Sequence, residues 1–244
     1  MIVIPARYQS TRLPGKVLSD IAGRTMIEHV YRRAAQAQAS AVIVATDDDR
    51  IRQAVEGFGG TAVMTSTAHA TGSDRLAEAV AALDGDIVIN VQADEPLIEP
   101  AMIDEAAAAL RDAPEASIGT LRKAITDAAD LGNPNVVKVV VDLDGRALYF
   151  SRAGIPYARG GAPAAPSWRH VGIYAYRRAA LLALAALAPT PLEQTEMLEQ
   201  LRALEHGYRI QTRETMYDTI GVDTADDLDR VRRRLTTGAS SRGL

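Results

Sequence analysis

The chain has 244 residues, of which 47% are hydrophobic and 24% charged, so it can form a sizeable core without metal or disulfide staples. It contains no cysteine, which excludes disulfides, thiolate metal sites and cysteine nucleophiles. The net charge of −4 argues against a nucleic-acid-binding surface. The N-terminus shows no signal-peptide pattern, and the longest apolar run, residues 179–188, is far shorter than the ~20 residues of a membrane span. We therefore expect a cytoplasmic protein with neither nucleic acid nor membrane as a partner.

The first half of the chain alternates short apolar runs with helical patterns. Buried strands are expected at residues 2–4, 41–45 and 86–91, and helices at 25–38, 48–58 and 73–83. This alternation predicts an α/β fold with a mostly parallel central sheet and right-handed crossovers.

The second half is less regular. Strands are expected at residues 136–143, 147–151 and 171–176, with a hairpin turn at Asp144-Gly145, and helices at 179–188, 193–206 and from 223 to about 235. The segment 158–167 is rich in Gly, Ala and Pro and reads as a flexible loop, and residues 236–244 as a disordered tail. No linker is evident, which favours one domain over residues 1–235 with an inserted hairpin region at about 136–180.

A basic loop follows the first strand. It carries Arg7, Arg12 and Lys16, together with a Ser-Thr pair and Pro-Gly. Ligands of α/β proteins bind beyond the carboxyl ends of the strands, and these side chains suit a polyphosphate. The alternative is a solvated basic loop. The loop is not a Walker A motif, because Ser10 stands where that motif has Gly and Val17 where it has Ser or Thr.

Acidic residues follow two other strands. Asp94 and Glu95 end the strand at 86–91, where they suit a Mg²⁺ ion shared with substrate phosphates, although Asp-Glu-Pro alone is more often a solvated turn. Asp223 offers a second ligand, and in isolation it reads better as a helix N-cap, a role that Thr224 could also fill.

Three further sets of residues carry polar or charged side chains of interest. In Thr71-Gly72-Ser73-Asp74-Arg75 a cap is expected, but Arg75 fits a helix N-terminus poorly unless an anion is near. The four histidines lack metal-ligand spacing. A polar and aromatic set could bind an acidic sugar or form a subunit interface; it comprises Tyr149, Arg152, His170, Tyr174 and Arg177.

Taken in order, six motifs resemble one family, the 3-deoxy-manno-octulosonate (Kdo) cytidylyltransferases. They are PARYQSTRLPGK from Pro5, TGSDR from Thr71, VQADEP from Val91, LYFSR from Leu148, RHVGIY from Arg169 and GVDT from Gly221. The resemblance runs from about Ile2 to Arg234. The first motif is shared with sialic-acid cytidylyltransferases, whereas the later motifs and LEQLR from Leu198 favour the Kdo enzyme.

The resemblance implies a three-layer fold like that of nucleotide-diphospho-sugar transferases, working as a homodimer. It implies CTP and Kdo as substrates, CMP-Kdo and pyrophosphate as products, Mg²⁺ as cofactor, and a role in lipopolysaccharide biosynthesis. The hairpin region would bind sugar and form the dimer.

The resemblance also implies roles for particular residues. Catalysis would fall to Lys16, Arg12, Asp94 and Asp223, the last two as ligands of Mg²⁺. The nucleotide would be bound by Pro5, Ala6, Arg7, Arg12, Lys16, Ser73, Arg75 and Gln92. The sugar would be bound by Gln92, Arg152, His170, Tyr174, Glu196 and Gln200.

One position departs from the family pattern, which has Gly where this chain has Ala93. A methyl group there would reduce activity if the backbone needed a positive φ or close contact with a ligand. Three rivals remain: a cytidylyltransferase for another acidic sugar such as sialic acid or 8-amino-Kdo, a catalytically silent nucleotide-binding protein, and an acidic interaction module.

Overall fold

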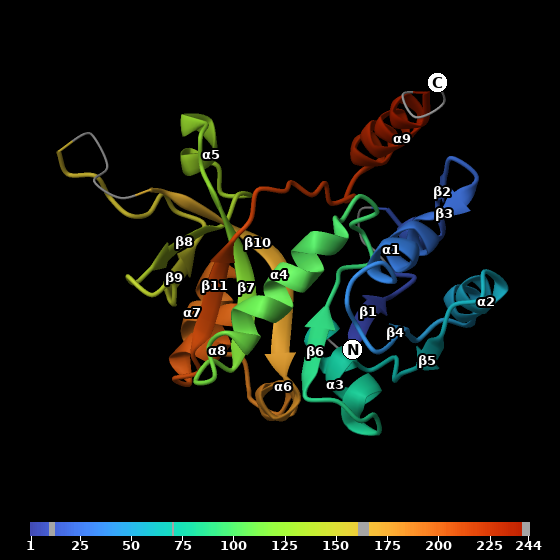
Figure 1. The fold of residues 1–244 in the computed structure, drawn as a ribbon, viewed down its shortest axis with the longest axis horizontal. Helices are drawn as coiled ribbons and strands as arrows, with labels where there is room; N and C mark the ends of the chain where they lie inside the picture. Colours follow the sequence, from blue (N-terminus) through green and yellow to red (C-terminus); the bar gives the residue numbers. More distant parts are fainter. Residues whose placement is uncertain (10–12, 70, 161–165, 241–244) are drawn as a thin grey trace. The chain divides into compact units, whose positions relative to one another are not determined.

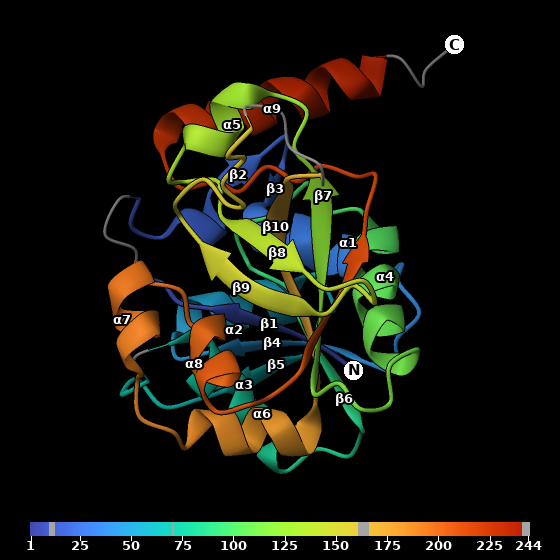
Figure 2. The same cartoon turned by 90° about the vertical axis from the view of Figure 1, so that its left-hand side faces the viewer.

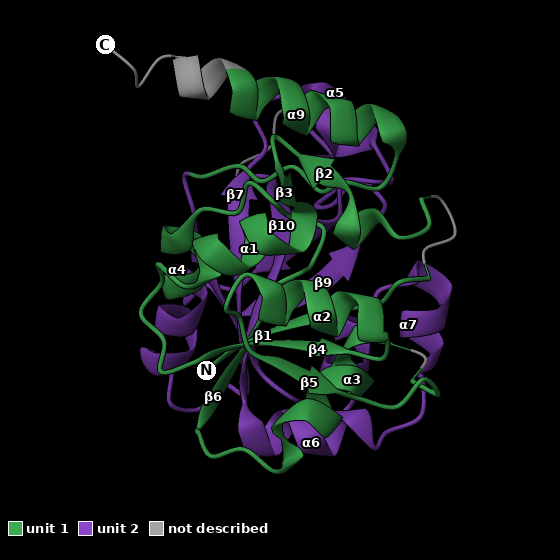
Figure 3. Cartoon of the chain, turned by 90° about the vertical axis from the view of Figure 1, so that its right-hand side faces the viewer, with its two compact units in different colours: residues 1–104, 217–244 green, residues 105–216 purple. Residues whose placement is uncertain are grey.

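The computed structural model describes residues 1–9, 13–69, 71–160 and 166–240. The chain forms two compact units: unit 1 comprises residues 1–104 and 217–244, and unit 2 comprises residues 105–216 (Figure 3). Unit 2 is therefore an insertion in the sequence of unit 1. The single domain expected over residues 1–235 stays a prediction.

Unit 1 contains a parallel sheet. Its strands, in spatial order, are β6 (Ile87–Asn90), β1 (Ile2–Ala6), β4 (Val42–Thr46) and β5 (Ala62–Met64), shown in Figure 1. Ile2 pairs with both Val42 and Ile89 and is completely buried, as a strand covered on two faces requires. The three strands expected in this half are confirmed, whereas β5, which has only three residues, was not expected.

Helices connect these strands in the expected rhythm. They are α1 (Met26–Ala34), α2 (Asp49–Gly57) and α3 (Gly72–Ala81), preceded by the 3₁₀ turn η1 (Lys16–Leu18) and the small hairpin of β2 (Asp20–Ile21) and β3 (Arg24–Thr25). Thr25 and Asp48 cap the first two helices with their side chains. Because the crossovers are right-handed, α1 and α2 cover one face of the sheet and α3 the other.

Unit 2 is built on a mixed sheet. β11 (Ile210–Glu214) runs parallel to β7 (Ile118–Ala124), which is antiparallel to β10 (Trp168–Arg177); β10 in turn pairs with β8 (Lys138–Val141). β8 and β9 (Ala147–Ser151) form the expected hairpin, with Gly145 at a φ of 80° in its turn, and lie side by side in Figure 2. The mostly parallel arrangement expected for the fold therefore describes unit 1, and unit 2 adds antiparallel pairs.

The helices of unit 2 include two that the sequence reading missed. These helices are α5 (Ala128–Gly132), α6 (Arg178–Ala185), α7 (Pro191–Glu196) and α8 (Gln200–Glu205), and α4 (Pro100–Arg111) runs from unit 1 into unit 2. α4 was missed because its alanine-rich face gives weak periodicity, and α5 because it is short.

The continuous helix expected at 193–206 is wrong. The chain breaks at Met197, whose φ of 52° is left-handed, and this residue separates α7 from α8. Arg152 compensates for the break, because its guanidinium donates to the carbonyl oxygens of Glu196 at 2.7 Å and Met197 at 3.3 Å. A tertiary contact thus overrides a strong helical pattern.

The last helix, α9 (Ala225–Ser240), extends beyond the expected end at residue 235, so residues 236–240 are helical and not a disordered tail. Residues 241–244 lie outside the described part. In the loop expected at 158–167, residues 161–165 also lie outside it, and the described remainder is neither helix nor strand. Within the described ranges, every helix is too short or too polar to cross a membrane.

Candidate functional site

Unit 1 contains a cavity of about 430 Å³ at the carboxyl ends of its strands. Its wall is formed by Pro5, Ala6, Arg7, Lys16, Val17, His69, Thr71, Gly72, Arg75, Gln92, Ala93, Asp94 and Asp223. The position agrees with the rule that open α/β sheets bind ligands beyond the carboxyl ends of their strands.

The sheet register explains why the basic and acidic loops meet at this cavity. β1 and β6 are adjacent and parallel, with Val3 opposite Asn90. Arg7 follows the end of β1 and Gln92 follows the end of β6 within two residues, so both loops leave the sheet at the same edge. Arg7 is exposed and makes no hydrogen bond or ion pair with another described residue, so its charge is available to a ligand.

Lys16 is held between two carboxylates. The basic loop closes where the Gly15 amide donates to the Tyr8 carbonyl at 2.9 Å, and Gly15 has a φ of 69°. Lys16 then extends inwards, 9% exposed, and its Nζ donates to Asp94 Oδ2 at 2.7 Å and Asp223 Oδ1 at 3.0 Å. Burial alone would lower the pKa of Lys16, but the two carboxylates raise it above its ordinary value, so the side chain stays charged.

Asp223 is held near Asp94 by hydrogen bonds of the preceding residue, Val222. The Val222 amide donates to the Asp94 carbonyl at 2.9 Å, and Lys16 Nζ donates to the Val222 carbonyl at 2.8 Å. The cap of α9 is Thr224, which exchanges hydrogen bonds with Asp227 at 3.1 and 3.2 Å. The two roles weighed for Asp223 are thus separated in the structure, because Thr224 caps the helix and Asp223 faces Lys16.

Arg75 also has an anion beside it. The cap of α3 is formed by Thr71 and Asp74, which bond each other's backbone amides at 3.1 Å. Arg75, 4% exposed, donates to Asp47 Oδ2 at 2.7 Å and to the hydroxyl of Thr65. The carboxylate of Asp47 therefore supplies the anion that an arginine in the first turn of a helix requires.

Most of the residues predicted for nucleotide and metal lie at this cavity. The wall contains Pro5, Ala6, Arg7, Lys16, Arg75, Gln92, Asp94 and Asp223. Ser73 lies in the first turn of α3 and does not belong to the described wall. Arg12 lies outside the described residues. The roles of all these residues stay predictions.

His69 also belongs to the cavity wall and was not predicted from the sequence. This side chain lines the cavity and pairs with Glu78, which also accepts from the Ser66 amide at 2.8 Å. The backbone bond from Ser66, followed by His69, lowers the pKa of Glu78. No spacing rule signalled this pair; its proximity to the Thr71 cap, two residues on, was the available clue.

The residues predicted to bind sugar form two groups in unit 2, apart from Gln92 in unit 1. In the first group, Glu196 accepts from the Ser151 hydroxyl at 2.6 Å and the Arg152 amide at 2.9 Å. Arg152 donates in addition to the Pro134 carbonyl at 3.0 Å. Gln200 begins α8, four residues after Glu196. The side chains of Glu196 and Arg152 thus have a structural role, because they connect the end of β9 to the residues between α7 and α8.

The second group is aromatic. His170 and Tyr174, both on β10, have ring centroids 5.3 Å apart, and His170 meets Phe150 edge-on at 5.0 Å. His170 Nε2 lies 3.0 Å from the Thr120 hydroxyl. Burial lowers the pKa of His170 to about 3, so the ring is neutral at physiological pH.

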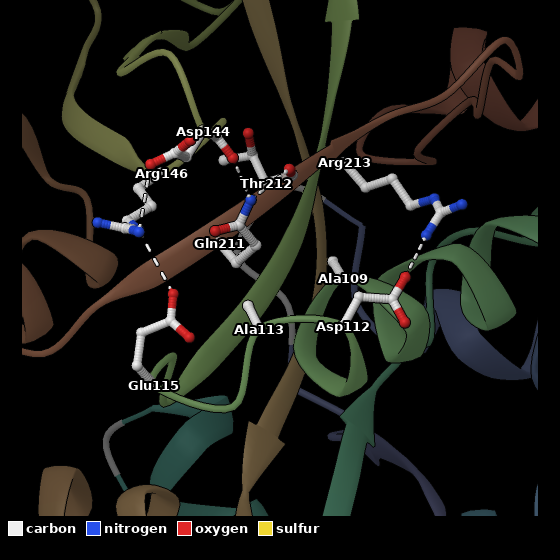
Figure 4. Close-up of a pocket in the computed structure, with 9 residues that line it drawn as sticks. All are labelled: Ala109, Asp112, Ala113, Glu115, Asp144, Arg146, Gln211, Thr212 and Arg213. Atoms are coloured by element: carbon white, nitrogen blue, oxygen red, sulfur yellow. Dashed lines mark hydrogen bonds and ion pairs between the residues drawn. The ribbon is translucent and has the colours of Figure 1, made fainter.

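Unit 2 has its own cavity, of about 310 Å³, near the start of β11 (Figure 4). Its charged side chains pair with each other: Arg213 lies 2.9 Å from Asp112, and Arg146 lies 3.5 Å from Glu115 and 3.3 Å from Asp144. Each of these arginines therefore faces a carboxylate of the same cavity.

Ala93 sits in the wall of the unit 1 cavity and is 6% exposed. Among the described residues other than glycine, a positive φ occurs at Ala22 and Met197. Ala93 therefore does not need the backbone freedom of glycine, and its methyl group reduces the space at the wall and adds no backbone strain.

The chain is similar over nearly all its length to proteins of known class. The family model described as Cytidylyltransferase matches residues 1–210. A 3-deoxy-manno-octulosonate cytidylyltransferase of Geobacter sulfurreducens is 53% identical, covering 96% of this chain and 98% of the relative. One of Myxococcus xanthus is 55% identical, covering 94% and 93%.

Solved structures agree with these relatives. The structure of CMP:2-keto-3-deoxy-manno-octonic acid synthetase complexed with CTP is 48% identical and superposes with a TM-score of 0.93, covering 97% of this chain and 98% of the other. A 4-diphosphocytidyl-2C-methyl-D-erythritol synthase from Anaerococcus prevotii, 15% identical with a TM-score of 0.62, shares the fold alone.

The chain belongs to the cytidylyltransferase family and is a nucleotidyltransferase. Within that family its relatives at about half identity are 3-deoxy-manno-octulosonate cytidylyltransferases. The resemblance and the nucleotidyltransferase-like α/β fold expected from the sequence are confirmed. The rival interaction module is excluded.

Proposed function

We propose that this protein transfers CMP from CTP to the anomeric hydroxyl of Kdo and releases pyrophosphate, which activates Kdo for lipopolysaccharide biosynthesis. The observation that carries this proposal is the cluster of Lys16, Asp94 and Asp223 at the wall of a cavity with two arginines. The cluster occurs in a chain whose relatives carry out this reaction by name. We place the reaction in the cytoplasm.

The reaction forms one bond and breaks another at the α-phosphorus of CTP. The C2 hydroxyl oxygen of the sugar forms a bond to the phosphorus and its proton is released to water, while the bond to the bridging oxygen breaks and pyrophosphate takes the electron pair. Such transfers depend mainly on positioning and on neutralising charge. In this chain, the exposed Arg7 suits the triphosphate, and the ammonium of Lys16 suits the charge that develops on pyrophosphate.

The two carboxylates fit Mg²⁺. Asp94 and Asp223 already hold one cation, the Lys16 ammonium, and carboxylate oxygens are ligands that Mg²⁺ prefers. When bound, Mg²⁺ would neutralise phosphate charge and favour ionisation of the attacking hydroxyl. Asp94 lies four residues after the end of β6, and its carbonyl accepts a hydrogen bond from the Val222 amide, the neighbour of Asp223.

We also infer that the protein works as a homodimer through the hairpin region of unit 2. Large apolar side chains are exposed there: Leu143 and Leu148 on the hairpin, and Tyr157 in the following loop at 86% exposure. Monomers seldom expose several large apolar groups close together in the chain unless a partner covers them. Sedimentation velocity at micromolar concentration tests this, and a monomer would contradict it.

The first test of function is pyrophosphate release with CTP, Mg²⁺ and one sugar at a time. We expect turnover with Kdo and none with sialic acid or 8-amino-Kdo. Turnover with another sugar alone would move the specificity, and no release with any sugar would indicate a silent nucleotide-binding protein.

The metal assignment has its own test. Asp94→Asn keeps the side-chain shape and removes the charge, so we expect kcat to fall at least ~100-fold while the circular dichroism spectrum stays unchanged. Asp112→Asn, in the cavity of unit 2, is the matched control and should keep normal turnover. Near-normal turnover of Asp94→Asn would refute the assignment of Asp94 as a metal ligand.

A further inference from the structure

Glu95 stands next to Asp94 but takes no part in the contacts of Lys16. Its Oε2 accepts a hydrogen bond from the Thr219 hydroxyl at 3.0 Å, across 124 residues of sequence. Burial, followed by the negative charge of Asp94, raises the pKa of Glu95 to about 7. The bond therefore joins the acidic loop after β6 to a distant segment of the chain.

That distant segment is where the chain returns to unit 1. The return segment, residues 217–223, starts at the unit boundary, contains neither helix nor strand, and ends at Asp223. No regular secondary structure therefore fixes the path of the backbone that delivers the second carboxylate to the cavity.

Individual contacts fix the return segment instead, among them the hydrogen bonds from Lys16 Nζ to the Val222 carbonyl at 2.8 Å and to Asp223 Oδ1 at 3.0 Å. Near its start the Thr219 side chain bonds to Glu95, and near its end the Val222 amide bonds to the Asp94 carbonyl at 2.9 Å. Val222 is also completely buried in a core cluster with Leu97. Apolar packing is non-directional, so it keeps Val222 buried without fixing the orientation of the backbone. The hydrogen bonds of Thr219 and Val222 are directional and therefore fix that orientation.

These last two hydrogen bonds link adjacent residues of the acidic loop to nearby residues of the return segment. On one side are Asp94 and Glu95, and on the other are Thr219 and Val222, with Asp223 next in sequence. A shift of the return segment would lengthen the Thr219 bond and move Asp223 relative to Asp94. Two ligands of one ion must be placed within a few tenths of an ångström, because Mg²⁺ demands nearly ideal geometry.

We propose that Thr219 and Glu95 are positioning residues, whose hydrogen bond sets Asp223 against Asp94 and so tunes the affinity of the site for Mg²⁺. This inference rests on the proposed role of Asp94 and Asp223 as metal ligands. Neither Thr219 nor Glu95 touches the reacting atoms; both act through the two aspartates.

The test compares variants of the hydroxyl. Thr219→Val keeps the shape and removes the donor, whereas Thr219→Ser keeps the donor and removes the methyl group. For the Val variant we expect the Mg²⁺ concentration at half-maximal turnover to rise about three- to tenfold, the range that one hydrogen bond supports. At saturating metal, kcat should stay within about threefold, and the Ser variant should behave like the wild type.

A second readout does not depend on turnover. Binding of Mn²⁺, followed by its electron paramagnetic resonance signal with CTP and without sugar, should weaken by the same factor in Thr219→Val. Glu95→Met removes the acceptor and should weaken Mn²⁺ binding equally, and the double variant should be no weaker than either single variant, since all three lack the same bond.

The outcomes separate this inference from the proposed function. Unchanged Mn²⁺ binding in Thr219→Val, alongside lost binding in Asp94→Asn, would refute the positioning role alone. Normal binding in Asp94→Asn would refute the metal ligands themselves. If Thr219→Ser were as weak as Thr219→Val, the methyl group and its packing would be the cause, which also overturns the inference.

Discussion

The two cavities of this protein contain similar side chains and use them differently. In unit 1, Arg7 has no described partner, and Lys16 is shared by two carboxylates that belong to two distant segments. In unit 2, Arg146 and Arg213 are paired with acidic residues of their own cavity. Both have arginine and aspartate in the wall, so composition alone does not distinguish them.

The two cavities differ in the partners of their charged side chains and in the position of those side chains relative to the strand ends. In unit 1, Arg7 and Asp94 lie in loops that follow the parallel strands β1 and β6, and the ammonium of Lys16 lies between two carboxylates that could also bind a metal cation. In unit 2 the paired acidic side chains include exposed ones, with Asp112 at 69% and Asp144 at 72%, and their partners Arg213 and Arg146 belong to the same cavity. We therefore recognise a candidate binding site by charged side chains that could bind a ligand or a metal ion in place of their present partner.

The largest effect is expected at Lys16. Lys16→Met keeps most of the volume but removes the charge proposed to stabilise pyrophosphate, so kcat should fall about 100- to 1,000-fold. The variant also leaves Asp94 and Asp223 without their cation, so Mg²⁺ should raise its melting temperature more than that of the wild type. Pyrophosphate release and thermal unfolding with and without Mg²⁺ measure the two effects.

A lysine elsewhere provides the control. Lys123, on β7 of unit 2, donates to the Met216 carbonyl at 3.0 Å and has no proposed catalytic role. Lys123→Met should retain turnover within about twofold. Turnover of Lys16→Met within threefold of the wild type would remove the distinction between the two cavities.

Unit 1 shows how much of the site the sequence could predict. Its parallel strands are continuous apolar runs, so the loops that follow them could be located, and Arg7, Lys16 and Asp94 with them. The meeting of Asp94 with Asp223 depends on a return segment without regular structure, which periodicity does not reveal. That pair was found through the family resemblance, and the Thr219 contact that accompanies it was not found.

Unit 2 shows the opposite case. The helical pattern at 193–206 was strong, but the helix breaks at Met197, and Arg152 from another element binds the freed carbonyl oxygens. Local sequence cannot report such a partner. His69 was missed for a similar reason, because its position at the cavity follows from the fold of the loop before α3.

A buried ion pair of unit 2 should matter for stability and not for catalysis. Glu193 and Arg202 lie 2.6 Å apart with side chains only 12% and 7% exposed. Glu193→Gln keeps the capping bond to the Thr190 amide but leaves Arg202 without its charge partner, so unfolding should become easier by ~3 kcal/mol at pH 7. Urea denaturation measures this.

The same pair gives a pH dependence. The hydrogen bond from Arg202, followed by the Thr190 amide, lowers the folded-state pKa of Glu193 below the ordinary value of 4.5. The stabilisation is therefore complete above about pH 4.5 and is lost as the pH falls through the lowered pKa. The gap between wild type and Glu193→Gln should narrow below pH 4.5; a gap that widens there, or one under ~0.5 kcal/mol at pH 7, would contradict the prediction.

The smallest effect is expected at the cavity of unit 2. Asp112→Asn breaks the ion pair with Arg213, whose side chain is 48% exposed, and water screens such a pair. Stability should change by less than ~1 kcal/mol, and less still in 1 M salt, where the Debye length is ~3 Å. The KM values for CTP and Kdo should stay within about twofold, because the cavity's charges satisfy each other. A severalfold rise in either KM would show that the cavity of unit 2 binds substrate. Mutual pairing of the charged side chains would then not distinguish a cavity without a ligand from a binding site.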